Sequence, residues 1–212
     1  MGSIPAKLVC APAEAAGRSR DTRRGARGVV WIMTEREQAE ATTTDSGWPR
    51  HGRLDYGAVV PDAIGAMLGL ERVVASSTLE PLLLELVKVR ASQLNGCAYC
   101  VDMHTKDARA IGEDEQRLHL VAVWREAPSF TSRERVALAW TEALTLLPGT
   151  GAPDDVYERV ACEFDPAEQV ALTLAIIAIN GWNRLSVGFR TPAGSYVSGR
   201  QPGPGIEVPA GR

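Results

Sequence analysis

The sequence predicts an all-α fold, a bundle of about six to seven helices. Nearly every segment between residues 54 and 190 has apolar residues at helical spacing, and no run alternates polar and apolar residues as a half-exposed strand does. Of the 212 residues, 45% are hydrophobic and 23% charged, which is typical of a globular protein. We therefore expect one helical domain with its own core.

The first four helices begin at prolines or N-cap residues and end at glycines or before prolines. Pro61 and Pro81 suit the first turn of a helix, since proline lacks only an N–H group that is unpaired there. Gly96 and Gly112 are suitable helix ends, and Pro128 follows the fourth helix. The expected helices cover about residues 61–74, 81–95, 97–111 and 114–125.

Two capping patterns mark the later helices. Thr131 and Glu134 form a capping box that begins a helix ending near Leu147, and a short helix follows from about residue 154. Asp165, followed by proline, begins the last helix, which is apolar on nearly all sides up to Ile179. Such a helix must be buried in the bundle centre or against another subunit, so we expect a homo-oligomer.

Both ends of the chain differ from this helical region. Residues 1–53 are rich in Gly, Arg, Thr, Ser and Pro and lack sustained periodicity, and residues 191–212 carry several prolines and glycines. We expect two disordered tails around a domain at residues 54–190.

Charge and apolar runs exclude several classes of protein. The formal net charge of −3 leaves no basic excess for nucleic acid, and the longest apolar run, residues 170–179, is about half a membrane span. No signal peptide is recognisable at the N-terminus, so a cytoplasmic location is expected. Four cysteines at uneven spacing make no disulfide framework, and a C-x-x-C pair in the cytoplasm indicates redox or metal chemistry.

That pair, Cys97 and Cys100, shares a helix face with His104, because the three stand at i, i+3 and i+7. Gly96 places Cys97 near the first turn, where unpaired N–H groups and the helix dipole favour a thiolate. His104, one turn beyond Cys100, is within reach as a base.

A single carboxylate, Glu85, stands among five apolar residues in the helix at 81–95. It either lies at the edge of the apolar stripe or faces the thiols. In the second case burial should raise its pKa and let it accept protons.

Two stretches resemble the AhpD-like, carboxymuconolactone decarboxylase superfamily: Ala91-Ser-Gln-Leu-Asn-Gly-Cys-Ala-Tyr-Cys-Val-Asp-Met-His-Thr-Lys-Asp-Ala108 and Ile179-Asn-Gly-Trp-Asn-Arg-Leu185. The resemblance implies an all-helical fold, trimers or hexamers, and a thiol peroxidase without haem, flavin or metal. It also implies a dithiol reductant of the lipoyl or thioredoxin type.

By the same resemblance, Cys100 is the peroxidatic cysteine and Cys97 its resolving partner. Glu85, at the family's offset of twelve residues before Cys97, forms a proton relay with His104. One position departs from AhpD, which has a histidine where this chain has Tyr99. No cofactor-binding or metal-binding residues are expected.

Three other interpretations use the same residues. The decarboxylase branch of the superfamily works by acid–base chemistry and lacks the cysteine pair, which argues against it here. A zinc site would have three ligands in Cys97, Cys100 and His104 but no nearby fourth, since His119 and Cys162 are distant in sequence. A dithiol sensor that oxidises without turnover would share every residue of the peroxidase.

Overall fold

The structure is a computed structural model, and it describes residues 52–199. These residues form helices and no strand, which confirms the all-α prediction. The helices are α2 (Tyr56–Val59), α3 (Pro61–Ala75), α4 (Pro81–Leu94), α5 (Ala98–Ala110), α6 (Glu115–Leu120), the 3-10 helix η1 (Val121–Val123), α7 (Ser132–Thr145), α8 (Leu147–Thr150), α9 (Asp154–Glu163) and α10 (Pro166–Phe189).

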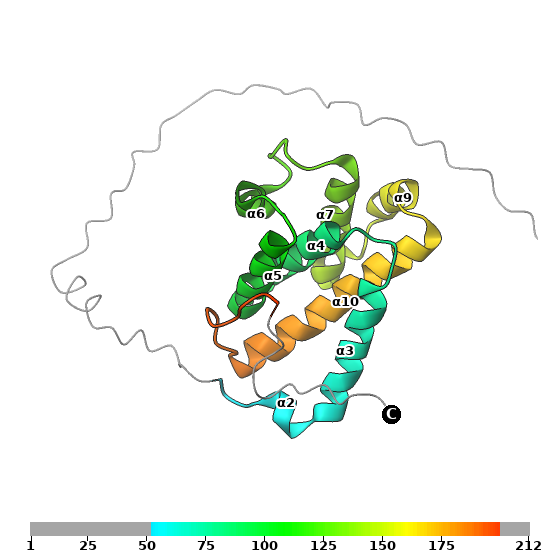
Figure 1. Ribbon diagram of the computed structural model, residues 1–212. Coiled ribbons are helices and arrows are strands. Elements are labelled where there is room, and N and C mark those ends of the chain that lie inside the picture. The colour runs from blue at the N-terminus through cyan, green and yellow to red at the C-terminus, as the bar shows by residue number, and fades with distance from the viewer. Residues whose placement is uncertain (1–51, 200–212) are drawn as a thin grey trace, which may run out of the picture. The chain divides into compact units, whose positions relative to one another are not determined.

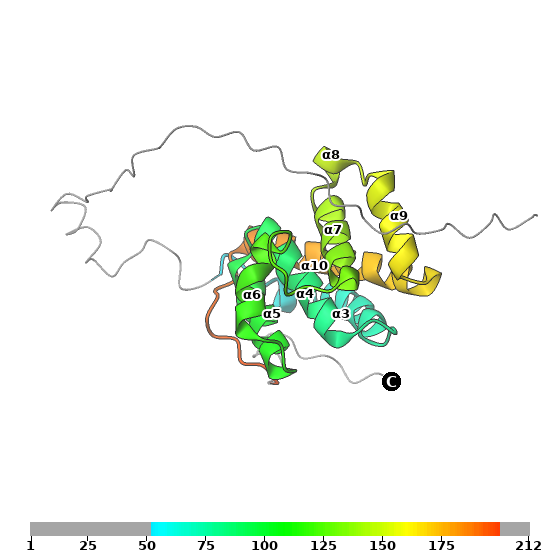
Figure 2. The ribbon, with the colours of Figure 1, turned by 90° about the horizontal axis from the view of Figure 1, so that it is seen from above.

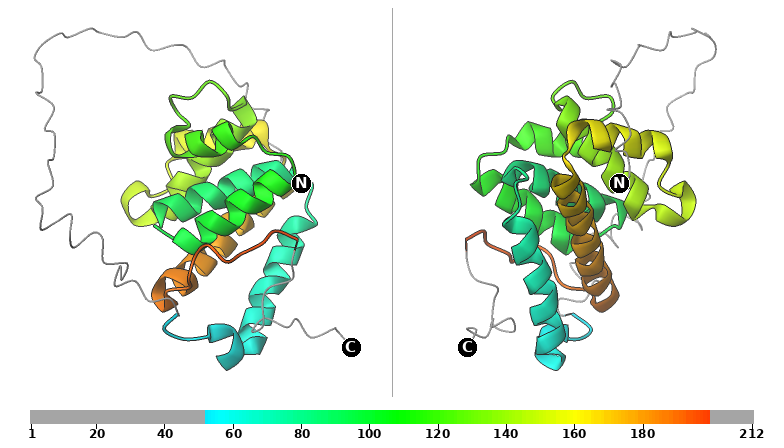
Figure 3. Two further views of the ribbon diagram at one scale, coloured as in Figure 1. Left: turned by 60° about the vertical axis from the view of Figure 1, so that its left-hand side comes forward. Right: turned by 90° about the vertical axis from the view of Figure 1, so that its right-hand side faces the viewer.

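Helix α4 lies at the centre of the domain. It packs against α5, α7 and α10, and α3 packs along α10 (Figure 1). Seen from above, α6 lies beside α5, while α8 and α9 extend beyond α7 (Figure 2). The tight turn at residues 95–97 joins α4 and α5 into an αα-hairpin, whose two helices lie side by side in the left view of Figure 3.

Helix α4 is buried on several sides, so its apolar residues belong to different parts of the core. Leu83 and Val87 pack with residues of α7, α9 and α10, such as Trp140 and Ile176. Leu86 and Val89 pack instead with α5, α6 and α7. A third, small cluster contains Ala91, Cys97, Cys100 and Ile179. The cysteines therefore lie at the edge of the core rather than on an exposed loop.

Most expected helix starts agree with the structure, including both capping boxes, at Thr131 and at Asp165. The ends differ at two places. The fourth helix is α-helical only to Leu120 and continues as the 3-10 turn η1, and the fifth ends at Thr145, before the single turn α8. The last helix continues past the apolar stretch that ends at Ile179 and reaches Phe189, and its Asn180 and Asn183 make hydrogen bonds inside the bundle.

The longer α10 also changes one conclusion about membranes. The expected apolar run of residues 170–179 is too short to span a bilayer, whereas the whole of α10 has the length and hydropathy of a membrane span, alone among the helices of residues 52–199. A central helix of a soluble bundle has the same properties. The packing of α10 against α3, α4, α5 and α7 fits that second explanation.

The expectation of a disordered C-terminal tail needs correction at its start. Residues 191–199 form no helix or strand, yet Gly194 and Tyr196 hydrogen-bond to side chains of α5. Polar contacts thus hold residues 191–199 against α5, which the amino-acid composition of this segment does not indicate. The remainder of that tail, and the N-terminal tail up to residue 51, lie outside the described residues.

Candidate active site

The turn between α4 and α5 places Cys97 at the N-cap of α5. Gly96 has φ +64°, a conformation that strains residues with a Cβ, and so permits the abrupt change of direction. The Sγ atom of Cys97 accepts a hydrogen bond from the backbone N–H of Cys100 at 3.3 Å. Its sulfur therefore takes the place of the usual capping oxygen, where partial positive charge favours a thiolate.

Cys97 and Cys100 form a disulfide, with their Cα atoms 5.4 Å apart. Both side chains are buried, with 2% and 1% of their surface exposed. Their spacing in the sequence predicts that the two residues lie close together, and the structure joins their sulfur atoms.

Asparagine side chains of α10 hold this turn in place. Asn95, the C-cap of α4, donates to the side-chain oxygens of Asn180 and Asn183 at 3.0 and 2.9 Å. Asn183 also donates to Ser92 Oγ at 3.0 Å and is 1% exposed. Asn183 is thus packed inside the chain, and its hydrogen bonds to Asn95 and Ser92 hold the turn that carries Cys97.

Replacing Asn183 with alanine should lower the free energy of unfolding by about 2 kcal/mol, because Ser92 and Asn95 then keep buried polar groups without partners. Urea denaturation followed by circular dichroism measures this change. Val187, also on α10, is 46% exposed, and Val187→Ala serves as the control with an expected change below about 0.5 kcal/mol. Equal losses in the two variants would contradict the positioning role.

His104 and Glu85 meet across the α4–α5 hairpin. The Nδ1 atom of His104 lies 2.8 Å from Glu85 Oε2, and the histidine is 5% exposed. Glu85 therefore faces the site, and the alternative of a carboxylate at the edge of the apolar stripe is wrong. An ionised carboxylate only accepts, so Nδ1 carries the hydrogen and donates a hydrogen bond to Glu85.

The expectation of a raised pKa for Glu85 is also wrong. Burial acts to raise the pKa, but the hydrogen bond and charge of His104 and the charge of Lys88 together outweigh it and bring the pKa below its ordinary value. Lys88 Nζ lies 3.5 Å from Glu85 Oε1 and 3.2 Å from Glu71 Oε2. Glu85 is thus an ionised partner of His104, not a group that titrates near neutral pH.

Lys88 and Glu71 also belong to the site, although neither is predicted from the sequence. Glu71 accepts a hydrogen bond from Trp182 Nε1 at 3.1 Å, so polar pairs run from α10 through α3 and α4 to His104 on α5. Lys88 stands three residues after Glu85, a spacing at which side chains on a helix meet, and this signal could have identified it. Nothing local in the sequence indicates Glu71, which reaches the site from another helix.

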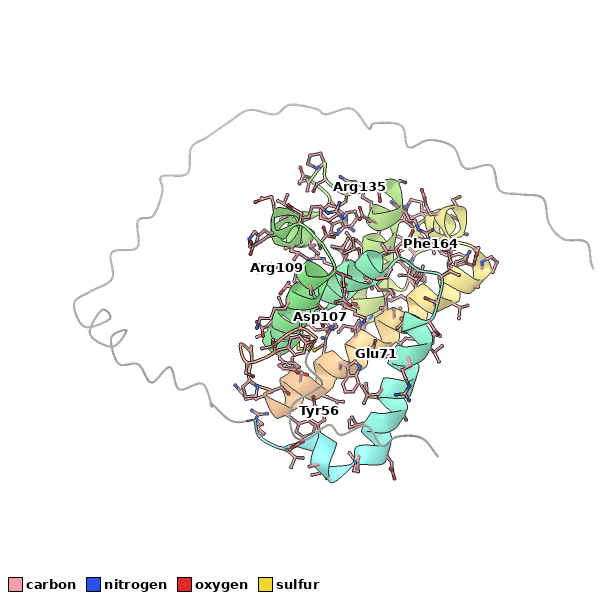
Figure 4. All side chains as sticks on the ribbon, in the orientation of Figure 1. Tyr56, Glu71, Asp107, Arg109, Arg135 and Phe164 are labelled. Atoms are coloured by element: carbon pink, nitrogen blue, oxygen red, sulfur yellow. A yellow bond between two sulfur atoms is a disulfide. The ribbon has the colours of Figure 1, made fainter. Side chains whose placement is uncertain are left out.

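A pocket with a volume of about 250 Å³ lies beside these groups. Its lining is mostly aromatic and apolar with a few polar groups: Tyr56, Leu68, Glu71, Tyr99, Cys100, Met103, His104, Trp182, Ser186 and Tyr196. Two of these residues, Tyr56 and Glu71, are labelled in the lower half of Figure 4, whereas Arg135 and Phe164, which do not line the pocket, are labelled in the upper half. Cys100 and His104 both line this cavity, while Cys97 is not among its lining residues.

Tyr99, which stands where AhpD has a histidine, lines this pocket. Burial and the nearby Tyr56, Asp102 and Asp107 raise its pKa. Tyr99 therefore stays neutral at physiological pH and contributes an aromatic surface to the pocket.

One group of side chains could hold a cation. Ligand atoms of Glu85, His104 and Asp107 lie within 4.8 Å of one another. These atoms already have partners, because Glu85 binds His104 and Asp107 accepts from Tyr196 at 2.8 Å. His119 and Cys162, considered above as zinc ligands, are exposed and do not line the pocket.

Comparison with known proteins gives consistent results. The model of the carboxymuconolactone decarboxylase family matches residues 61–143. The uncharacterized protein YdfG of Bacillus subtilis is 39% identical over 143 residues, which are 68% of this chain and 97% of YdfG.

Two solved structures share the fold. ATU0492 of Agrobacterium tumefaciens, a protein of unknown function named as a candidate antioxidant defence protein AhpD, is 46% identical, with a TM-score of 0.67 over 69% of this chain and all of that one. An uncharacterized peroxidase-related protein of Ralstonia eutropha, described as an alkylhydroperoxidase AhpD core, is 18% identical, with a TM-score of 0.58 over 66% of this chain and 74% of its own. This chain belongs to the AhpD-like, carboxymuconolactone decarboxylase superfamily.

Proposed function

We propose that this protein is a thiol-dependent peroxidase of the AhpD type, which reduces peroxides with the Cys97–Cys100 dithiol and a Glu85–His104 proton relay. The observation that supports it most is the position of Cys100. This residue is paired with Cys97 at a helix start, and it lines the same pocket as a histidine held by a buried carboxylate.

The first step is the deprotonation of Cys100. His104 Nδ1 is committed to Glu85, so Nε2 is the nitrogen that takes the thiol proton. Glu85 stays ionised, fixes this tautomer and stabilises the imidazolium that forms.

The thiolate of Cys100 then attacks one oxygen of the peroxide. The S–O bond forms as the O–O bond breaks, and the leaving oxygen takes the proton from His104 and departs as an alcohol or water. Cys100 is oxidised to a sulfenic acid, and the peroxide is reduced by two electrons.

Cys97 completes the oxidation. Its thiolate attacks the sulfenic sulfur of Cys100, a disulfide forms as the S–O bond breaks, and the departing hydroxide takes up the proton that the Cys97 thiol gave up and leaves as water. The capping position of Cys97 favours the thiolate that this attack requires. A dithiol reductant of the lipoyl or thioredoxin type returns both cysteines to thiols by exchange.

A steady-state assay with peroxide and dihydrolipoamide or a thioredoxin-type donor tests the proposal. We expect many turnovers for each protein molecule. A single stoichiometric oxidation that then stops would instead identify a dithiol sensor. Muconolactone decarboxylation that persists in a Cys97→Ser, Cys100→Ser double variant would identify the acid–base branch.

We also propose that the protein acts in the cytoplasm as a homo-oligomer, a trimer or hexamer. Ile177 on α10 and Leu147 on α8 are 53% and 49% exposed, and both line a shallow hollow between α7, α8 and α10. Val170, also on α10, is 59% exposed. Apolar side chains grouped in this way favour contact with a second copy.

Sedimentation at micromolar concentration should show a species several times heavier than the 22.8 kDa chain. Ile177→Glu should shift it toward the monomer, because a charge buried in an apolar interface is strongly unfavourable. Ile111, 50% exposed at the end of α5, provides the control Ile111→Glu, which should leave the assembly intact. A wild-type protein that sediments only as a monomer would contradict the oligomer.

A further inference from the structure

Residues 191–199 form a strap across α5. They follow the end of α10, where Arg190 takes a left-handed conformation with φ 53° and turns the chain. In the left view of Figure 3, this red-brown segment crosses the face formed by α5 and α10. Without helix or strand of its own, the strap depends on side-chain contacts for its position.

Three polar residues of α5 hold the strap. Lys106 Nζ donates to the carbonyl oxygen of Tyr196 at 2.9 Å and to that of Gly194 at 3.4 Å. Asp102 accepts from the backbone N–H of Gly194 at 3.0 Å and pairs with Lys106 at 2.8 Å. Asp107 accepts from the hydroxyl of Tyr196 at 2.8 Å. The anchors follow Cys100 on the same helix by two, six and seven residues.

The side chain of Tyr196 is the part of the strap that reaches the pocket. It lines the cavity together with Cys100 and His104 and is partly buried. Burial and the hydrogen bond to Asp107 raise its pKa far above the usual value, so the phenol keeps its proton and remains a donor. The other lining residues belong to helices. Tyr196 is therefore the lining residue that can move away from the pocket without the unfolding of a helix.

We propose that Tyr196 is a specificity-determining residue and that the strap limits the size of the molecules that reach Cys100. While Asp102, Lys106 and Asp107 hold the strap, the pocket admits small molecules and delays bulky ones. The selection among peroxides rests on the proposed peroxidase function. The access to the thiol does not, and it can be measured separately.

Alkylation of Cys100 measures this access without any peroxidase activity. The protein carries Cys97→Ser, so that Cys100 alone of the pair reacts, and it is reduced with dithiothreitol that is then removed. Rates are compared for iodoacetamide, which is small, and N-(1-pyrenyl)maleimide, which is bulky. Mass spectrometry of the peptide that contains Cys100 reports each rate.

Tyr196→Ala removes the wall, and Lys106→Met releases the strap without altering a residue that lines the pocket. Each should raise the pyrenylmaleimide rate by roughly tenfold. This is the change expected when a strap that is open about a tenth of the time becomes open most of the time. The iodoacetamide rate should stay unchanged. Tyr196→Phe keeps the ring and loses the bond to Asp107, so its rate should lie between wild type and Tyr196→Ala.

Tyr157→Ala is the control, since Tyr157 is an exposed tyrosine of α9 outside the pocket, and both of its rates should equal those of the parent protein. A ratio of the two rates that stays at the parent value in either Tyr196→Ala or Lys106→Met overturns the proposal. With Cys97 restored, kcat/KM for cumene hydroperoxide relative to hydrogen peroxide should rise in the same variants. Absence of turnover with both peroxides would refute the proposed function alone, because the alkylation rates would still test the strap.

Discussion

Cys100→Ser should abolish peroxide turnover, with kcat/KM falling on the order of 10³-fold or more, because no other group can replace the attacking sulfur. Cys97→Ser should instead stop after the first step, with Cys100 held as a sulfenic acid that has no partner for disulfide formation. The two variants lose the same disulfide, so each controls for any effect of that loss on the fold.

Mass spectrometry after one equivalent of peroxide, with a reagent specific for sulfenic acid, distinguishes the two cysteines. We expect the adduct on Cys100 in Cys97→Ser and none on Cys97 in Cys100→Ser. The opposite distribution would mean that the capping cysteine attacks the peroxide and the pocket cysteine resolves it.

Glu85→Gln and His104→Phe should each slow thiolate formation by about 10²- to 10⁴-fold, the usual effect of losing a positioned acid or base. The amide introduced by Glu85→Gln is nearly isosteric with the ionised carboxylate, but it cannot stabilise an imidazolium as the carboxylate does. Groups that act as one unit are strongly non-additive, so the double variant should be little slower than either single one. Reaction of the reduced protein with peroxide, measured across pH, gives these rates.

The matched control is Glu142→Gln on α7. Glu142 is also a largely buried carboxylate, paired with Arg90 and Arg125, and its pKa is lowered despite burial by hydrogen bonds from Trp124, Arg125 and Arg90. Its loss should lower stability and leave the rate of thiolate formation unchanged. Two outcomes would contradict the relay: a double variant whose loss of rate is the product of the two single losses, or a Glu85→Gln variant that forms the thiolate at the wild-type rate. In either case the start of α5 alone would activate the thiol.

The pH dependence follows from the lowered pKa of Glu85. Because this pKa lies below the ordinary value of 4.5, Glu85 stays ionised across the neutral range and gives no inflection there. A carboxyl whose pKa is lowered by folding stabilises the protein above its unfolded pKa, and this stability is lost as the pH falls through the folded pKa. In Glu85→Gln the free energy of unfolding should therefore fall less steeply than in the wild type as the pH is lowered below about 4.5.

The sequence predicted what depends on neighbours along the chain. The capping boxes at Thr131 and Asp165 need only local spacing, and the structure has them. Local spacing also places Cys97 at the start of α5 and puts Cys100 and His104, four residues apart, in the lining of one pocket. The packing of α5 on α4 then brings His104 to Glu85, as the resemblance to the family implied.

The rest depends on contacts between distant residues. The pKa of Glu85 could not be obtained from its apolar neighbours, because the compensating charges of His104 and Lys88 meet it only in the folded hairpin. In the same way, the hydrogen bonds of Asn183 to Asn95 and Ser92 join residues that are distant in the sequence, so no local pattern indicates them. The strap looked like a tail because its anchors, about 90 residues earlier, give no local signal.

The disulfide spans only three positions along the chain, and this separation bears on how folding responds to oxidation. A cross-link restricts the unfolded chain more when it closes a longer loop, and a loop this short gives about 2 kcal/mol at most in the chain-entropy relation. The oxidised and reduced forms thus draw their stability mainly from the same helical core. The fold should therefore persist in both redox forms, so that opening or closing this disulfide changes the state of the two sulfur atoms and leaves the helical bundle in place.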